Sequence, residues 1–199
     1  MKNIEELLGR YRLSAGAAGH TPKTMDDVIR PVRLFSDFIG DIEAKEVTAN
    51  TAKAFIVWLR DKDVWSGTNH AKDHKLSSTS VNTYFRAVRS FWSFLFREGL
   101  IVQNPLAGVR PPKKSQTIPK TFSEEEMQLV FAQLKPGTRE EVFVLMFLDS
   151  GIRLGELLRL PMKRLDLQNR RALVEGKGGK ERKVYFCSIT ENSIKAYID

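Results

Sequence analysis

The stretch LDSGIRLGELLRL, residues 148–160, places an arginine and a glutamate inside an otherwise apolar pattern. Its leucines and isoleucine recur at helical spacing, and with the residues before them they predict one continuous helix from Glu140 to Leu160, ended by the proline that follows. A charge buried in such a helix is costly unless it is paired or used. Arg153 and Glu156 therefore form either a surface ion pair worth roughly a few tenths of a kcal/mol or part of a site.

Small residues surround this charged pair. Asp149 and Ser150 interrupt the apolar run just before Gly151. We expect Gly151 and Gly155 to keep the surface near Arg153 bare, so that a phosphate can approach the guanidinium closely.

A second stretch, EGKGGKERK at residues 175–183, is rich in glycine and lysine. Such a turn can surround a phosphate with backbone N–H groups and an ammonium, although a solvated tight turn is an equally good interpretation of the stretch alone. It is not a Walker A loop, because Glu181 follows Lys180 where that motif needs serine or threonine. Arg153 and Lys177, on separate elements, are able to converge on one phosphate.

Composition favours a polyanionic partner. The 199 residues carry a formal charge of +8, with an isoelectric point near 9.6. Cys187 is the only cysteine, which excludes an intramolecular disulfide and a cysteine-rich zinc site. The acidic start lacks the apolar core of a signal peptide, and the longest apolar run, Val142 to Leu148, is far shorter than the roughly 20 residues of a membrane span. We expect a soluble cytoplasmic protein with no membrane partner.

Hydrophobic periodicity predicts a helical bundle first. Helices are expected at about Ile4–Ala15, from Pro22 with Thr21 as N-cap, at Thr48–Asp61, and along the apolar stripe Val81–Phe96.

The segment NPLAGVRPPKKSQTIPK, residues 104–120, then predicts a linker. Beyond it, Ser123 and Glu126 form a capping box that opens a helix to about Leu134. A hairpin of residues 172–175 and 183–187 follows, and Thr190 is expected to cap a last helix.

Together, DSGIRLGELLRLPMKRLDL and ALVEGKGGKERKVYF resemble the start of the catalytic domain of tyrosine site-specific recombinases, the phage-integrase and Xer-like family. The helical part, with KTMDDVIRPVRLFSDFIG and LSSTSVNTYFRAVRSFWSFLFREGL, is similar to that family's core-binding domain. The resemblance implies a mainly α fold. A four-helix SAM-like core-binding domain would occupy residues 1–108 and a linker 109–120. The first half of a mostly helical α/β catalytic domain with a small hairpin or sheet would occupy residues 121–199.

The resemblance also implies roles for individual residues. Arg153 would contact the non-bridging oxygens of the scissile phosphate, Glu156 would support that arginine, and Lys177 would protonate the 5′-hydroxyl leaving group. Lys180 and Arg182 would contact phosphate beside them. No cofactor or metal is expected.

The family completes its site with an H-x-x-R motif, a further histidine or tryptophan, and a tyrosine nucleophile near the C-terminus. Here His20, His70 and His74 all precede residue 75, and no arginine follows Arg182. The four tyrosines lie outside the nucleophile's context, so we expect half a catalytic site. His70 and His74 have a zinc-like spacing, but they lie in a polar loop with no convincing third ligand.

The starts of the second and fourth predicted helices offer hydroxyls, amides and lysines, which suit phosphates at helix N-termini. A solvated polar face is the alternative interpretation of each of these surfaces. With the resemblance, we expect DNA contacts at Lys23, Thr24, Lys75, Thr79, Asn82 and Arg86, and at Lys113 and Lys114 in the linker.

Three functional hypotheses follow. The first is part of a tyrosine recombinase or integrase for site-specific DNA recombination through a 3′-phosphotyrosyl bond. It would act on a double-stranded recombination site, as a tetramer on DNA in the complete protein, in association with the nucleoid. The second is a non-catalytic DNA-binding module that occupies recombination sites, and the third is a helical protein-interaction module whose basic charge is incidental.

Overall fold

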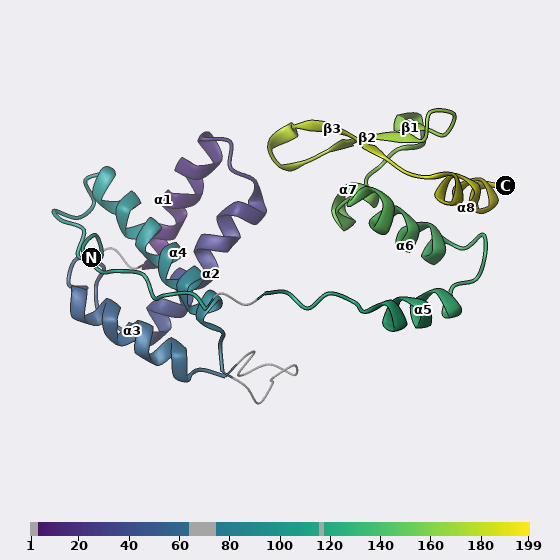
Figure 1. The fold of residues 1–199 in the computed structure, drawn as a ribbon. Helices are drawn as coiled ribbons and strands as arrows, with labels where there is room; N and C mark the ends of the chain where they lie inside the picture. Colours follow the sequence, from purple (N-terminus) through teal and green to yellow (C-terminus); the bar gives the residue numbers. More distant parts are fainter. Residues whose placement is uncertain (1–3, 64–74, 116–117) are drawn as a thin grey trace. The chain divides into compact units, whose positions relative to one another are not determined.

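The computed structural model describes residues 4–63, 75–115 and 118–199, and it divides the chain into two compact units, Met1–Ile118 and Pro119–Asp199 (Figure 1). Helices dominate both units, and the second also holds a small sheet, which confirms the predicted fold class. No helix in the described part of the chain is long and apolar enough to cross a membrane. The first unit contains α1 (Ile4–Ala17), α2 (Pro22–Ile39), α3 (Ala49–Asp61) and α4 (Ser78–Arg97). The second contains α5 (Glu124–Gln133), α6 (Arg139–Ser150), α7 (Leu154–Leu157), η1 (Met162–Arg164), β1 (Leu165–Asp166), β2 (Arg171–Glu175), η2 (Lys177–Gly179), β3 (Glu181–Tyr185) and α8 (Ser188–Ile198).

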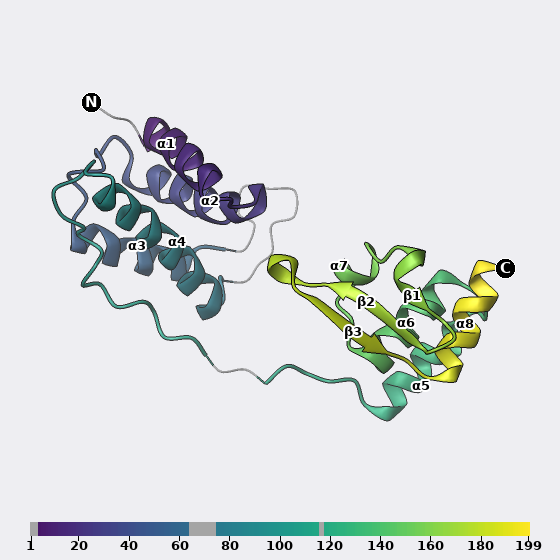
Figure 2. The ribbon, with the colours of Figure 1, turned by 90° about the horizontal axis from the view of Figure 1, so that it is seen from above.

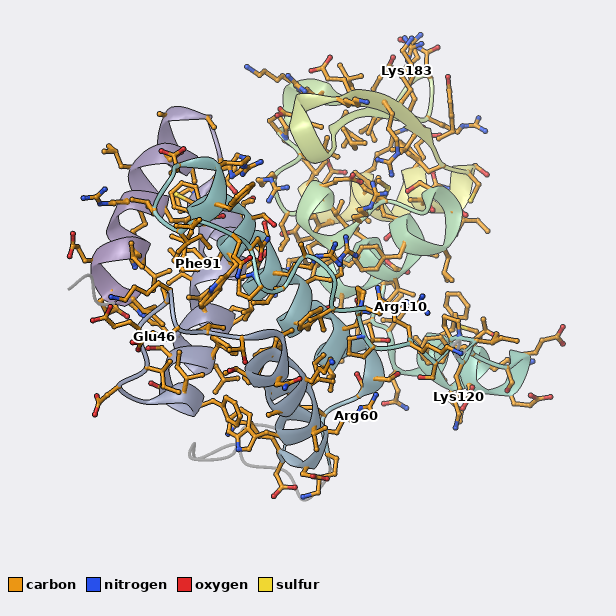
Figure 3. The ribbon with its side chains drawn as sticks, turned by 90° about the vertical axis from the view of Figure 1, so that its left-hand side faces the viewer. Glu46, Arg60, Phe91, Arg110, Lys120 and Lys183 are labelled. Atoms are coloured by element: carbon orange, nitrogen blue, oxygen red, sulfur yellow. The ribbon has the colours of Figure 1, made fainter. Side chains whose placement is uncertain are left out.

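Aromatic rings fill the core of the first unit. Phe35 on α2 meets Phe55 on α3 and Trp92 on α4 edge-on, with ring centroids 4.8 and 5.1 Å apart. All three side chains are fully buried, and the Trp92 indole donates a hydrogen bond to the Ala44 carbonyl at 3.3 Å. Figure 3 shows Phe91 among these helices, while Arg60 extends from the surface. The predicted apolar stripes therefore face one another, as amphipathic helices require.

The first part of the predicted linker packs on this unit. Leu106 and Val109 are buried in its core, and Pro112 is buried as well. Asn82 on α4 donates a hydrogen bond from its amide nitrogen to the Pro112 carbonyl at 2.6 Å. The chain therefore contacts the helical unit well beyond the end of α4.

The sheet of the second unit covers one side of α6 and α8 (Figure 2). Its strands are antiparallel in the order β1-β2-β3, with Ala172 opposite Val184. Ala172, Val174 and Val184 face a core that also contains Met146 of α6 and Ile194 of α8. The predicted hairpin is present, but its second strand is Glu181–Tyr185 rather than residues 183–187, and β1 was not predicted.

The predicted continuous helix over Glu140–Leu160 is wrong. Helix α6 ends at Ser150, and its C-cap is Gly151, whose φ of +59° is left-handed and whose N–H donates to the Phe147 carbonyl. The Ser150 hydroxyl bonds the Met146 carbonyl and accepts from the Ile152 amide, which occupies the backbone groups at the break. Arg153 is then extended, at φ −79° and ψ 147°, and stands at the N-cap of α7.

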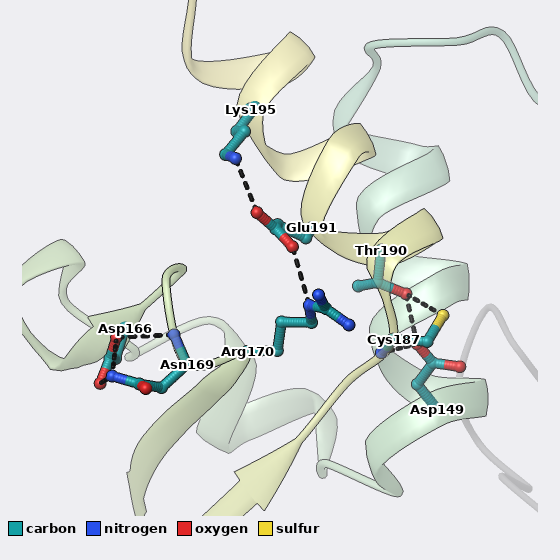
Figure 4. A network of polar contacts seen from close by, with 8 residues as sticks. All are labelled: Asp149, Asp166, Asn169, Arg170, Cys187, Thr190, Glu191 and Lys195. Carbon is teal, nitrogen blue, oxygen red and sulfur yellow. Dashed lines mark hydrogen bonds and ion pairs between the residues drawn. The ribbon is translucent and has the colours of Figure 1, made fainter.

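Asp149 connects the end of α6 to the start of α8 (Figure 4). Its carboxylate accepts a hydrogen bond from the Cys187 amide at 2.8 Å and another from the Thr190 hydroxyl. Bonds from the Cys187 and Thr190 side chains and from that amide lower the pKa of Asp149. The N-cap of α8 is therefore Cys187, and the prediction that Thr190 caps this helix is wrong, because Thr190 is buried against Asp149.

We expect Gly151→Ala to lower the free energy of unfolding of the second unit by about 1 kcal/mol, since a Cβ disfavours left-handed backbone. No atom lies within 4 Å of the position of that Cβ, so the cost is conformational. Gly151→Asn should cost less, because asparagine tolerates this region. Native-state hydrogen exchange of the α6 and α8 amides measures the effect.

The matched control is Gly16→Ala, at a helical glycine of α1 with open space around it. It should stabilise the first unit by about 0.5–1 kcal/mol. Equal protection of α6 in Gly151→Ala and in the original chain would contradict the assignment of a left-handed helix stop.

Candidate phosphate-binding site

The buried carboxylate of Glu156 lies between two arginines. Its side chain is 3% exposed, and Oε1 accepts a hydrogen bond from the Arg153 guanidinium at 2.8 Å. Oε2 accepts from the Arg182 guanidinium at 2.8 Å and from the Arg153 backbone N–H at 3.0 Å. Gly176 lies alongside, where a Cβ would stand 3.5 Å from Oε1. A short helix, a strand and the hairpin turn therefore meet at one carboxylate.

These contacts keep Glu156 ionised. The hydrogen bond from Arg182, followed by the one from the Arg153 amide, lowers its pKa to about 2 from the ordinary value of 4.5. Burial acts in the opposite direction and is outweighed. The carboxylate therefore remains a charged acceptor throughout the neutral range.

Arg153 extends from this buried carboxylate into solvent. Its side chain is 73% exposed, whereas that of Arg182 is 39% exposed. A guanidinium has five N–H donors, and among the described residues the Glu156 carboxylate engages the Arg153 side chain through one of its terminal nitrogens. One negative charge neutralises only one of the two arginines. The cluster therefore keeps a net positive charge and free donors, which suit a phosphate.

A cavity of about 390 Å³ adjoins the Glu156 carboxylate. Arg159, Lys163 and Arg164 contribute cations to its lining, and Glu175 contributes a second carboxylate. The Arg159 guanidinium lies over Gly155, 3.4 Å from where a Cβ would stand, so the expectation that this glycine leaves the surface bare is wrong. The sequence shows the surplus of basic residues in this part of the chain. It does not predict the cavity, because the cavity depends on the turn that η1 makes after α7.

The glycine-rich stretch forms the predicted tight turn between β2 and β3. Gly178 and Gly179 have φ of +75° and +73°, and the Gly176 N–H donates to the Lys180 carbonyl at 2.7 Å. Lys180 is exposed, and the Lys177 backbone immediately follows the glycine that borders Glu156. The Lys177 side chain is outside the described structure. The backbone therefore brings this turn to the arginine cluster.

Arg182 was predicted as a phosphate contact beside the hairpin lysine. The structure shows that its guanidinium also donates to Glu156, and with its side chain 39% exposed the phosphate contact stays a prediction. In the register of β2 and β3, Arg182 is opposite Val174, on the core side of the sheet. The alternation of side chains along a strand predicts which face of the sheet Arg182 is on. It does not predict that its partner is Glu156, which is 26 residues away in the sequence.

Most residues predicted to contact DNA are exposed in the first unit. Lys75 bonds the Asp63 carboxylate at 2.9 Å and the Asp61 carbonyl at 2.7 Å. Asn82 is the correction: it was expected on the polar face of α4, but it is 6% exposed and bonded to Pro112. His70 and His74 lie outside the described residues. The residues of the first unit that were predicted to contact DNA and are exposed are Lys23, Thr24, Lys75, Thr79, Arg86, Lys113 and Lys114.

Comparison with known proteins matches both units. Residues 6–115 match the phage integrase SAM-like domain, and residues 120–199 match the phage integrase family. The tyrosine recombinase XerC of Lactobacillus delbrueckii subsp. bulgaricus is 32% identical over 132 residues, which are 64% of this chain and 45% of that protein. XerC of Listeria innocua is 28% identical over 184 residues, 90% of this chain and 57% of that protein.

A crystal structure of a lambda integrase dimer bound to a COC′ core site has a similar fold. It matches with a TM-score of 0.71 at 16% identity, and the match covers 96% of this chain and 64% of that chain. The chain spans about half the length of the curated relatives described above.

We expect the Glu156 carboxyl, followed by ¹³C NMR, to titrate with a pKa of about 2. Because this folded-state pKa lies below the ordinary 4.5, the stability from the ionised carboxylate is full above pH 4.5 and is lost as the pH falls toward 2. Arg182→Ala should raise the pKa toward 4.5. Arg170→Ala, which removes the partner of Glu191 instead, should leave it unchanged. An ordinary pKa in the original chain would contradict the described contacts.

Proposed function

The chain belongs to the phage integrase family, and from that premise we propose that it binds a double-stranded DNA recombination site and contributes part of the catalytic site of a tyrosine recombinase. In the whole protein the reaction would be site-specific DNA breakage and rejoining, as in recombination and integration. The observation that carries the proposal is the buried Glu156 carboxylate, which holds the exposed Arg153 in place.

Arg153 would bind the non-bridging oxygens of the scissile phosphate. A guanidinium matches two phosphate oxygens with parallel N–H donors, and Glu156 fixes its orientation from below. Negative charge grows on these oxygens as the phosphate becomes five-coordinate. A preorganised cation there stabilises the transition state more than the ground state.

Lys177 would act as the general acid. In the proposed reaction a tyrosine hydroxyl gives its proton to water and its oxygen attacks the phosphorus, so that a 3′-phosphotyrosyl bond forms and the bond to the 5′-oxygen breaks. The departing 5′-oxygen takes a proton from the Lys177 ammonium and leaves as a hydroxyl. Lys180 lies in the same turn, where it would contact a neighbouring phosphate.

The first unit would provide the other DNA-binding surface. Its exposed Lys23, Thr24, Thr79 and Arg86 lie on α2 and α4, and the charge of +8 suits a phosphate backbone. Lys75, at 59% side-chain exposure, would add to this surface in addition to bonding Asp63. The complete protein would assemble as a tetramer on DNA and would be found with the nucleoid.

The positions of the tyrosines favour a second candidate for this chain, a non-catalytic module that occupies recombination sites. Tyr11 is buried against Phe91 and Phe94. Tyr185 is on the opposite face of β3 from Arg182, because the two are three residues apart on a strand. Tyr84 packs on the helical core, and Tyr197 lines an apolar groove on α8.

Binding to duplex DNA should weaken steeply as salt rises from about 50 to 200 mM, because phosphate contacts release counterions. Arg153→Ala should weaken binding by at least about tenfold, because a hydrogen bond to a charged group contributes roughly 1.5–3 kcal/mol. Fluorescence anisotropy across the salt series measures both. Arg139→Ala, an exposed arginine of α6, is the control. A flat salt response would favour the protein-interaction hypothesis, and equal effects of the two substitutions would contradict the role of Arg153.

A nicked duplex that traps phosphotyrosyl adducts should give no covalent product with this chain, because its four tyrosines lie in the surroundings described above. Denaturing electrophoresis measures the adduct, with a longer family recombinase on its own site as the positive control. An adduct on any of the four tyrosines, located by mass spectrometry, would contradict the non-catalytic interpretation.

A further inference from the structure

The segment after α4 is fastened to that helix on both sides of two lysines. Before them, the Pro112 carbonyl accepts a hydrogen bond from the Asn82 amide at 2.6 Å. After them, the Ser115 N–H donates to the Ser78 hydroxyl at 2.9 Å, and the two serine hydroxyls are 2.7 Å apart. Ser78 and Asn82 are four residues apart, so they share one face of α4. The chain therefore runs along this face in the direction opposite to the helix.

The Asn82 side chain is oriented by this contact. Because a carbonyl oxygen can only accept, the group that faces Pro112 is the NH₂. The other amide atom, Oδ1, is buried with no hydrogen-bond partner among the described residues. An unpaired buried acceptor has a real cost, so the bond to Pro112 is the interaction that offsets the burial of this polar side chain.

Apolar contacts reinforce the attachment. Leu106 is fully buried and Val109 is 6% exposed, both in the core of the helical unit. The Asn104 side chain accepts a hydrogen bond from the Leu106 amide at 3.0 Å and donates one to the Ser93 hydroxyl of α4 at 3.1 Å. The segment therefore reaches Pro112 from a fixed starting point.

The two lysines between the anchors, Lys113 and Lys114, are exposed. In the described part of the chain neither ammonium forms an ion pair. The anchor that follows them, Ser115, contacts the first residue of α4, where the helix has its partial positive charge. Two unpaired cations beside a positive helix end form a concentrated positive region. Such a region is stabilised by a polyanion.

We propose that Asn82 and Ser78 are positioning residues that hold Lys113 and Lys114 beside the start of α4, where both lysines bind the DNA backbone. The inference rests on the proposed DNA binding and deepens it. It replaces the predicted contact of Asn82 with an indirect role, because the buried amide reaches DNA only through the segment that it holds.

The test is the salt dependence of DNA binding by the full chain, since each phosphate contact adds about 0.9 to the slope of log affinity against log salt. The variant Lys113→Ala with Lys114→Ala should reduce this slope by about 1.8. Asn82→Ala should reduce it in the same direction. Added to the double lysine variant, Asn82→Ala should have no further effect, because it acts through those lysines.

Ser78→Ala is the second variant, at a half-buried position where the helix tolerates alanine. It should speed exchange of the Ser115 amide, which loses its acceptor, and should also reduce the slope. Ser90→Ala, exposed on the same helix, is the matched control and should change neither quantity.

A purely structural role would lower the folded fraction and the apparent affinity while leaving the slope unchanged. That result in Asn82→Ala and Ser78→Ala would overturn the proposal, as would additive effects in the combined variant. If the original chain binds DNA with a steep salt slope, an unchanged slope in these variants refutes the positioning role of Asn82 and Ser78 and leaves the proposed DNA binding intact. A flat slope in the original chain would overturn the proposed DNA binding and this inference with it.

Discussion

A carboxylate buried with only 3% of its side chain exposed has to be paired, and the pairing of Glu156 determines how the second unit is built. One oxygen bonds the Arg153 side chain, and the other bonds Arg182 of β3 and the backbone where α7 begins. The helix and the hairpin are joined by charge as well as by apolar packing. Replacing the carboxylate with an apolar group would leave two guanidinium groups to repel each other, and the turn that carries Lys177 would lose its neighbour.

The sequence predicted the elements whose signals are local. The N-caps at Thr21 and Ser123 are confirmed, because a hydroxyl beside free helix N–H groups needs no distant partner. The apolar stripe of α4 likewise meets the core. The break at Gly151 was missed because leucine and isoleucine continue at helical spacing across it. Hydrophobic periodicity predicts which residues are buried. It does not predict that a glycine adopts a positive φ and ends the helix.

Contacts between distant residues were beyond the sequence. Helical period predicted Asn82 on the polar face of α4, and the period does not show that the chain returns thirty residues later and buries it. Arg182 and Glu156 raise the same difficulty across the hairpin. The two-residue strand β1 is too short for any alternating pattern. The roles assigned to Arg153 and Lys177 came from a family resemblance and stay predictions, and the structure adds that Glu156 bonds the Arg153 guanidinium.

The anchoring at Ser115 also limits how far apart the two units can separate. From Ser115 to Ser123, the cap of α5, the chain has eight peptide steps, which span at most about 28 Å when fully extended. If the segment were unattached from the end of α4 onward, this contour length would be about three times longer. If the first unit binds DNA as we propose, the short tether would keep the second at an effective concentration on the order of millimolar. Two weak contacts with a duplex would then act as one strong one, and the length of the tether would restrict which neighbouring sites both units can occupy together.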